Sequence, residues 1–345
     1  MKSYINSDFF ALENKILDKV RDIKSDLSAR MLINHIIYLN LKTEKLLFEK
    51  DTCPEIEILG EIEYLYTFIK HLASFSDFSK NDLQTQHFVL EENHKTLFQK
   101  LWINFTFEEY KKERIGRYSK RIKINHIESL IENNRVVDFG CGHGNFLMSM
   151  QEFNPNECVG IDYGDQSIHF ANECKNKFFP EKNISFLVRS VYQTGLQDDY
   201  FDFAIQNGVF HHLENEEKAY SEVYRVLKQG GYLWVYTDGG GGIRDYIGDL
   251  SQKLLKNIDN NIIQDQIRTV GLTTNKEYHL GDSLSARYRH TDLPSIKAKL
   301  EDIGFEYVKQ LNGGCETDFD RPFCEDKFFE KKFGSGDLRL LFRKV

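Results

Sequence analysis

The most constraining feature of the sequence is the stretch VVDFGCGHGNF at residues 136–146, where an apolar run contains an acid and three glycines follow at every second position. A short apolar run that ends at glycine indicates a buried β-strand, and NFLMSMQEF at 145–153 has helical spacing. A strand, a glycine turn and a helix in this order predict a ligand site at the carboxyl end of the strand.

The acid in this turn restricts the kind of ligand. Glycine turns often approach phosphate groups, but the charge of Asp138 would repel a pyrophosphate. The dinucleotide pattern G-x-G-x-x-G also needs glycine at 145, where the chain has Asn145; its glycines are Gly140, Gly142 and Gly144. The sequence therefore disfavours NAD and predicts a ligand that is neutral or cationic near Asp138.

From about residue 124, short apolar strands alternate with helical patterns. The predicted strands are 135–139, 157–162, 184–188, 201–207, 231–237, 305–311 and 337–342, and the predicted helices are 124–131, 145–153, 165–179, 216–228 and 292–305. Strands that alternate with helices of this length imply right-handed crossovers and a parallel sheet with both faces covered. We therefore expect a doubly wound α/β domain.

The first part of the chain has helical spacing throughout, at 9–20, 29–48, 58–75 and 87–105. We expect a helical N-terminal or cap domain over residues 1–108, and a second domain over 109–345 that contains a helical insertion at about 243–280. The insertion and the long loop at 312–336 are candidates for a substrate cover.

Composition narrows the class of protein. The chain of 345 residues has a formal net charge of -8, which argues against sequence-independent nucleic-acid binding. No apolar run approaches 18 residues, so we expect no membrane span. The N-terminus lacks the pattern of a signal peptide. Six cysteines without C-x-x-C spacing are typical of free thiols in the cytoplasm, and no metal-ligand constellation is evident.

One segment is strongly basic, in contrast to the net negative charge of the chain. KKERIGRYSKRIK at 111–123 has seven Lys and Arg residues and one acid. It is either a solvated helix face or a site for an anion or carboxylate.

The glycine stretch followed by VGIDYGDQSI resembles motif I and the second-strand acid of class I S-adenosylmethionine-dependent methyltransferases. The resemblance continues through RSVYQTGLQDDYFDFAIQNGVFHHL and VYRVLKQGGYLWVYTDG, so that it covers about residues 124–240. It implies a mostly parallel seven-stranded sheet, with S-adenosyl-L-methionine as cofactor and S-adenosyl-L-homocysteine as product.

The resemblance also implies roles for individual residues. Asp138 is at the position the family uses near the methionine ammonium, and Asp162 can accept from both ribose hydroxyls. The remaining predicted cofactor residues are Gly140, Gly142, Gly144, Arg117, Tyr163, Ser190, Val191 and Asn207. Ser190 departs from the family, which commonly has an aspartate there, and Arg121 competes with Arg117 for the methionine carboxylate.

Three histidines are candidate catalytic bases, because the pKa of histidine suits proton removal near neutral pH. His211 and His212 follow the fourth strand of the domain, where one of them could instead pack or cap the next turn. His290 precedes the predicted helix at 293, with Asp292 as its predicted N-cap residue.

For the substrate, we expect contacts from Tyr246, Asp318 and Asp320. The two aspartates lie in a loop that could equally be solvated. We predict methyl transfer by in-line displacement to O or N of a small-molecule metabolite. The alternatives are an RNA or protein methyltransferase that docks its substrate on 111–123, a non-catalytic cofactor-binding subunit, and other chemistry with the same cofactor. A homodimer through the helical domain is possible.

Overall fold

A computed structural model describes residues 4–23, 25–75, 108, 110–286, 288–315 and 317–345. The chain divides into two compact units, each assembled from segments that are far apart in the sequence. The helical unit comprises Met1–Val89, Gly240–Arg287 and Glu325–Gly334, and the sheet unit comprises Leu90–Gly239, Tyr288–Cys324 and Ser335–Val345. We describe each unit by itself, and the domain boundaries drawn from the sequence stay a prediction.

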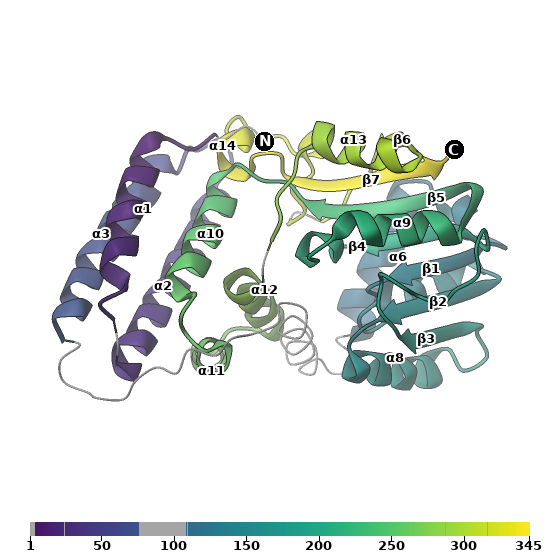
Figure 1. Cartoon of the computed structure of the whole chain (residues 1–345), viewed down its shortest axis with the longest axis horizontal. Coiled ribbons are helices and arrows are strands. Elements are labelled where there is room, and N and C mark those ends of the chain that lie inside the picture. Colours follow the sequence, from purple (N-terminus) through teal and green to yellow (C-terminus); the bar gives the residue numbers. More distant parts are fainter. Residues whose placement is uncertain (1–3, 24, 76–107, 109, 287, 316) are drawn as a thin grey trace. The chain divides into compact units, whose positions relative to one another are not determined.

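The sheet unit is built on seven strands in the order β3-β2-β1-β4-β5-β7-β6, which can be followed in Figure 1. Their bounds are β1 Arg135–Phe139, β2 Glu157–Asp162, β3 Ile184–Val188, β4 Phe201–Asn207, β5 Leu227–Asp238, β6 Phe305–Gln310 and β7 Asp337–Lys344. The first five strands pair in parallel, and β7 lies antiparallel between β5 and β6. The predicted doubly wound, mostly parallel seven-stranded sheet is confirmed.

Helices cover both faces of this sheet. They are η2 Tyr110–Ile115, a π-helix, then α6 Gly116–Ile124, η3 Glu128–Leu130, α7 Asn145–Ser149, η4 Met150–Phe153, α8 Asp165–Phe178, η5 Phe210–His212, α9 Glu216–Val226, α13 Leu293–Ile303 and η6 Arg321–Phe323. The helix predicted at 124–131 is wrong, because α6 ends at Ile124 and His126 has a positive φ of 53°. Only one 3₁₀ turn, η3, forms within that stretch.

The alternation of side chains along each strand explains why both faces are covered. Val136 lies in one apolar cluster and Val137 in the other, and both are fully buried. Phe203 and Ala204 of β4 divide in the same way. Burying an apolar side chain of this size stabilises a fold by roughly 1.5–3 kcal/mol. Since β2 and β4 both pair with β1, the strand order reverses there, and a ligand site is expected at its carboxyl end.

The helical unit contains α1 Ser7–Val20, α2 Asp26–Leu47, α3 Glu55–Phe75, α10 Ile243–Leu255, α11 Asn260–Thr269, α12 Thr274–Ser285 and α14 Phe329–Phe333. The predicted insertion is helical to Ser285 and packs on the N-terminal helices, with Asn40 donating to the Ser251 hydroxyl at 2.9 Å. Local signals set the helix starts: Asn6 and Ser25 are N-caps whose side chains accept backbone N–H groups. The helix predicted at 87–105 lies outside the described residues.

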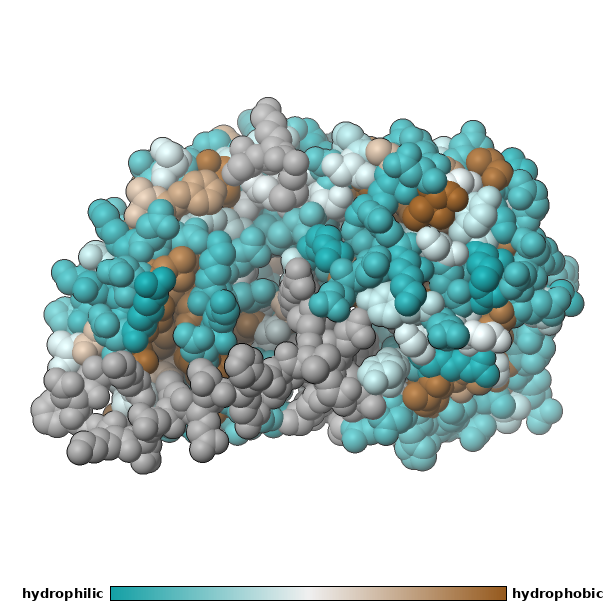
Figure 2. All heavy atoms as spheres, in the orientation of Figure 1, coloured by the Kyte–Doolittle hydropathy of each residue, from teal (hydrophilic) through white to brown (hydrophobic). Residues whose placement is uncertain are grey.

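The surface of the described residues is mostly hydrophilic in the view of Figure 2, with apolar side chains in small separate groups. Within the same residues, no helix combines the length and the apolar character that crossing a bilayer requires.

Candidate active site

The glycine turn after β1 is held by backbone hydrogen bonds to β2. Gly140 N–H and Cys141 N–H both donate to the carbonyl of Ile161, at 2.7 and 2.9 Å. Gly140, Gly142 and Gly144 all have positive φ, of 80°, 51° and 72°, a region that side chains other than glycine rarely adopt. The turn therefore needs glycine for its backbone conformation at all three positions.

The three glycines differ in what surrounds them. A Cβ at Gly140 would lie 2.5 Å from the Val209 side chain, and one at Gly144 would lie 2.4 Å from the Phe186 ring. At Gly142 a Cβ would meet nothing within 4 Å. Gly140 and Gly144 are thus needed for packing, whereas Gly142 presents open backbone against which a ligand can lie.

Asp162, at the end of β2, binds the turn directly. One carboxylate oxygen accepts from Gly142 N–H at 2.9 Å, and the other accepts from Gly164 N–H at 2.7 Å. Burial raises the pKa of Asp162, and these two amides oppose the rise. Each carboxylate oxygen can accept a further hydrogen bond. Asp162 therefore fixes the turn and can still receive hydroxyl groups of a ligand.

Asp138, near the end of β1, is a buried acid with an unsatisfied oxygen. Its side chain is 3% exposed, and Oδ1 has no hydrogen-bond partner among the described residues. Burial, together with the charge of Asp162, raises the pKa of Asp138 to about 8. A buried carboxyl group of this kind is stable when it is protonated or when a cation lies beside it.

The other residues predicted to bind cofactor lie on loops near these strand ends. Tyr163 is 50% exposed and follows β2, while Ser190 and Val191 follow β3. The Ser190 hydroxyl accepts from Tyr192 N–H at 3.3 Å. Asn207 ends β4, and its side chain bridges two aromatic residues: it donates to the Tyr118 hydroxyl at 3.1 Å and accepts from the Trp234 indole at 3.2 Å.

His211 and His212 are buried in η5 and contact each other. The backbone N–H of Asp238 donates to His211 Nδ1 at 3.2 Å, and the two Nε2 atoms are 3.0 Å apart. An N–H group can only donate, so in the neutral ring of His211 the proton is on Nε2. This proton is then donated to Nε2 of His212. These two hydrogen bonds therefore engage His211 Nδ1 and the Nε2 atoms of both rings.

His290 lies in the segment before α13 and pairs with Asp238, which ends β5. Its Nδ1 is 3.0 Å from Asp238 Oδ2, and each side chain is 13% exposed. The ring of Tyr288 stacks on both His211 and His290, with centroids 5.3 and 6.2 Å away. The structure thus brings all three predicted histidines together. Asp238 was not among the site residues predicted from the sequence, although it ends its strand as Asp162 does.

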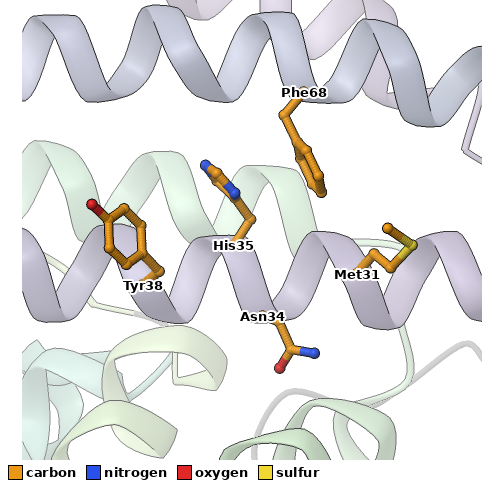
Figure 3. Close-up of a pocket in the computed structure, with 5 residues that line it drawn as sticks. All are labelled: Met31, Asn34, His35, Tyr38 and Phe68. Atoms are coloured by element: carbon orange, nitrogen blue, oxygen red, sulfur yellow. The ribbon is translucent and has the colours of Figure 1, made fainter.

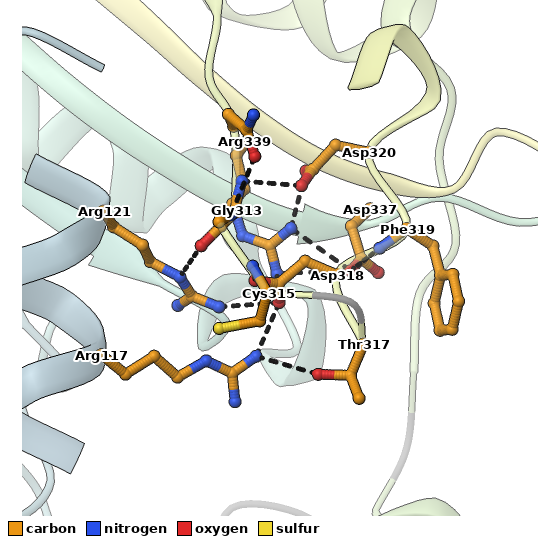
Figure 4. Close-up of polar contacts among 12 residues, drawn as sticks. Arg117, Arg121, Gly313, Cys315, Thr317, Asp318, Phe319, Asp320, Asp337 and Arg339 are labelled. Atoms are coloured by element: carbon orange, nitrogen blue, oxygen red, sulfur yellow. Dashed lines mark hydrogen bonds and ion pairs between the residues drawn. The ribbon is translucent and has the colours of Figure 1, made fainter. Parts of the chain in front are cut away.

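Arg117, predicted to bind cofactor, contacts a residue predicted to bind substrate (Figure 4). Arg117, Arg121 and Arg339 all donate to Oδ1 of Asp318, at 2.7, 2.7 and 3.0 Å. Burial by itself would raise the pKa of Asp318, but the three arginines hold it low, at about 2. The ion pairs join α6 to β7 through the loop before η6.

Asp320 belongs to the same network. It accepts from Arg339 at 2.6 Å and from Gly313 N–H at 2.8 Å. Its side chain is 1% exposed, and burial raises the pKa of Asp320 to about 6 although Arg339 lowers it. Asp318 and Asp320 are thus paired with arginines of the sheet unit, and their contact with substrate stays a prediction. Sequence reasoning missed Arg339, since nothing local marks it.

Most of the basic segment 111–123 is likewise engaged within the sheet unit. Besides the two arginines above, Lys120 donates to the carbonyl of Gly314 at 2.6 Å and Lys123 pairs with Glu152 at 2.9 Å. Lys111 lies over the Phe178 ring at 5.4 Å.

Tyr246, predicted to bind substrate, lies in α10 of the helical unit, where its hydroxyl donates to the carbonyl of Phe9 at 2.9 Å. That unit also has a pocket of about 320 Å³ lined by Met31, Asn34, His35, Tyr38 and Phe68. Figure 3 shows His35 pointing from α2 toward Phe68 of α3, and the two rings stack at 4.5 Å. Burial lowers the pKa of His35, which favours a neutral ring.

Comparison with known proteins identifies the domain. A family model described as a methyltransferase domain matches residues 137–235. The chain contains a class I methyltransferase domain. Over 119 residues it is 35% identical to a sterol 24-C-methyltransferase of Candida albicans, covering 33% of this chain and 31% of that protein. Over 114 residues it is 30% identical to an arsenite methyltransferase of Mus musculus, covering 30% of each.

The methyltransferase domain thus accounts for the matches, and the matched part is about a third of the length of these curated relatives. Among solved structures, a SAM-dependent methyltransferase from Aquifex aeolicus is 17% identical, with 70% of this chain and 100% of that chain covered and a TM-score of 0.42. That likeness is too low to support a conclusion.

The cofactor of such a domain is S-adenosylmethionine, and the residues of the turn fit it. The unsatisfied oxygen of Asp138 suits the ammonium group, and the open backbone at Gly142 suits a ligand that lies flat against the turn. The carboxylate of Asp162 suits the ribose hydroxyls. An acid in the turn is compatible with this ligand because it has no phosphate.

Proposed function

We propose that this protein transfers the methyl group of S-adenosylmethionine to an oxygen or nitrogen atom of a small molecule. The observation that supports this best is the glycine turn itself, where Asp138 has an unsatisfied buried oxygen and Asp162 binds the open backbone at Gly142. Together they offer partners for an ammonium and for hydroxyl groups within one loop.

Methyl transfer requires the protein chiefly to align the reacting atoms, because the methyl carbon is already activated by the sulfonium. When the acceptor atom has a proton, a base must remove it. The three histidines near the ends of β4 and β5 are the candidates, and they lie in the same unit as the glycine turn.

A small-molecule substrate is favoured over a macromolecule by two observations. The names of the relatives above refer to a sterol and to arsenite, both small molecules. The basic segment that would dock RNA or protein is largely engaged by partners such as Asp318 and Glu152, so less of its charge is available to phosphate groups.

For partners and location we propose a homodimer that forms through the helical unit, in the cytoplasm. Several large apolar side chains of α1 to α3 and the segments between them are exposed, namely Phe10, Leu27, Met31, Tyr38, Phe48, Ile56 and Tyr64, which favours a contact surface. All six cysteines are free thiols, as suits a reducing compartment. Sedimentation at several concentrations tests the dimer, and a monomer at every concentration would contradict it.

The first test of function is calorimetric titration with S-adenosylhomocysteine. Wild type should bind at micromolar concentration, and Asp162→Asn should bind at least about tenfold more weakly, because one of its oxygens becomes an amide donor. The matched control is Asp165→Asn, an exposed acid three residues away, which should bind as wild type does. Thermal unfolding of each variant shows whether the turn has been disrupted. Absence of binding to wild type would refute the proposal.

A further inference from the structure

Three arginines share one oxygen atom of Asp318 (Figure 4). Arg121 and Arg339 donate to its Oδ1 at 2.7 and 3.0 Å, and Arg117 donates to the same atom at 2.7 Å. The two oxygens of a carboxylate offer about four lone-pair sites, so each oxygen offers about two. Two of the three arginines therefore satisfy this oxygen, and the third is not required for it.

Arg117 is the least firmly held of the three arginines. Arg121 also donates to a backbone carbonyl at 2.7 Å, and Arg339 also donates to Asp320 at 2.6 Å. The second contact of Arg117 is with the Thr317 hydroxyl, at 3.5 Å. Its side chain is 23% exposed, against 4% for Arg121 and 2% for Arg339. Arg117 is therefore the member of this group that a ligand can reach.

Arg117 also has donors that the network does not use. Both of its contacts run through Nη2, and Nε has no hydrogen-bond partner among the described residues. Figure 4 shows a further nitrogen of the guanidinium pointing away from Asp318. A guanidinium presents its donors in a planar fork that matches the two oxygens of a carboxylate. Arg117 can therefore bind a second carboxylate while it stays attached to Asp318.

The formal charge of this network favours one further anion. Lys120 donates to the carbonyl of Gly314, which is a neutral group, so no carboxylate balances the lysine there. Among the described residues, these contacts join four cations to three carboxylates, namely Arg117, Lys120, Arg121 and Arg339 with Asp318, Asp320 and Asp337. One bound carboxylate would bring the formal charge of the group to zero.

The network lies on the same side of the sheet as the aromatic residues beside the glycine turn. Tyr236 of β5 pairs in register with Asn207 of β4 and with Arg339 of β7, and residues opposite each other in register point to one face. Asn207 donates to the Tyr118 hydroxyl at 3.1 Å. The Tyr118 ring stacks at 4.5 Å on Phe146, in the helix that follows the turn. A ligand of Arg117 would therefore lie near the cofactor.

The position along the sheet favours the acceptor substrate over the cofactor as the source of this carboxylate. The proposed partners of the cofactor are Asp138 on β1 and Asp162 on β2, whereas the network contains Arg339 of β7. β7 is the third strand from β1, a separation of about 14 Å at roughly 4.8 Å per strand. The ammonium and the carboxylate of the cofactor are attached to one carbon atom, so this carboxylate stays beside Asp138.

We propose that Arg117 binds a carboxylate group of the acceptor substrate, which is therefore an organic acid. The proposal rests on the proposed function, because it names the class of molecule that receives the methyl group. Asp318 holds the guanidinium by Nη2, and the remaining donors bind the substrate. The methyl group goes to another oxygen or nitrogen atom of the same molecule.

The test uses acetate as the simplest carboxylate and acetamide as its neutral counterpart. The readout is the Arg117 Nε–H signal in ¹H–¹⁵N spectra of protein labelled at arginine, assigned with Arg117→Lys. At constant ionic strength, acetate should shift this signal saturably at millimolar concentrations, and acetamide should not. Arg117→Lys keeps the charge but lacks the fork, so calorimetry should show at least about tenfold weaker acetate binding. The matched control Lys123→Gln removes a cation of the same helix and should bind acetate as wild type does.

The experiment is repeated with S-adenosylhomocysteine bound, to distinguish the two sources of a carboxylate. A persistent response to acetate supports the acceptor. If S-adenosylhomocysteine itself moves the Arg117 signal and abolishes the response to acetate, the carboxylate is that of the cofactor and the proposal is overturned. An equal response to acetamide, or no response in the free protein, would also overturn it. Failure of wild type to bind S-adenosylhomocysteine would refute the proposed function instead, and the acetate titration of the free protein does not depend on that result.

Discussion

Cofactor binding near neutral pH should release a proton from Asp138. The acid is buried, and its pKa is raised to about 8 by burial and then by the charge of Asp162. A ligand ammonium beside Asp138 stabilises the ionised form and lowers this pKa. The carboxyl group is therefore mostly protonated before binding and ionised afterwards.

The size of the effect follows from the pKa of Asp138. With a value of about 8, roughly nine in ten carboxyl groups carry a proton at pH 7, so binding should release about 0.9 proton. Binding that requires the ionised form should tighten about tenfold for each pH unit between 6 and 7, and less steeply as the pH approaches 8.

Calorimetric titration with S-adenosylhomocysteine in phosphate and in Tris measures this release, because the two buffers differ widely in ionisation enthalpy. The observed enthalpy should differ between them by about 0.9 of that difference. Asp138→Asn is the matched control: it has no proton to lose and should show no release, together with weaker binding.

Two results would refute the reasoning about Asp138. Equal enthalpies in the two buffers at pH 7 would mean that the acid is already ionised without ligand. A proton release that persists in Asp138→Asn would place the titrating group elsewhere.

Three further predictions concern stability and the turn. Gly144→Ala should lower the free energy of unfolding, measured in urea, by about 3 kcal/mol or more through left-handed backbone strain and collision with the Phe186 ring. Gly142→Ala should lower the free energy of unfolding by only about 1 kcal/mol. Calorimetry should nevertheless show that Gly142→Ala weakens S-adenosylhomocysteine binding. Asp318→Asn should lower the free energy of unfolding by roughly 3–5 kcal/mol. Because the pKa of Asp318 is lowered from 3.8 to about 2, the contribution of this acid to stability is present above pH 4 and is lost as the pH falls through 2. The stabilities of wild type and variant should therefore converge in acid. Lys332→Met should destabilise the helical unit by about 3 kcal/mol, since the buried ammonium donates to Asp326 at 2.8 Å and to a backbone carbonyl, and unchanged thermal unfolding would contradict this.

The sequence by itself determined the elements whose signals are local. Apolar runs bounded by glycine mark β1 and β2, so Asp138 and Asp162 could be placed at strand ends that meet at one edge of a parallel sheet. Side-chain caps such as Asp292 mark where helices begin. The glycines of the turn were likewise legible, because the backbone needs positive φ there.

Only the tertiary structure decided which polar side chains meet. Asp318 is neutralised by Arg117 and Arg339, which are 201 and 21 residues away in the sequence, and His290 is paired with Asp238, 52 residues away. A local pattern states which face of a strand or helix is buried, but a hydrogen bond depends on distances of about 3 Å between segments that only the packed sheet brings together. For that reason the cofactor turn could be inferred from residues 136–146, whereas the pairing of His290 with Asp238 had to await the fold.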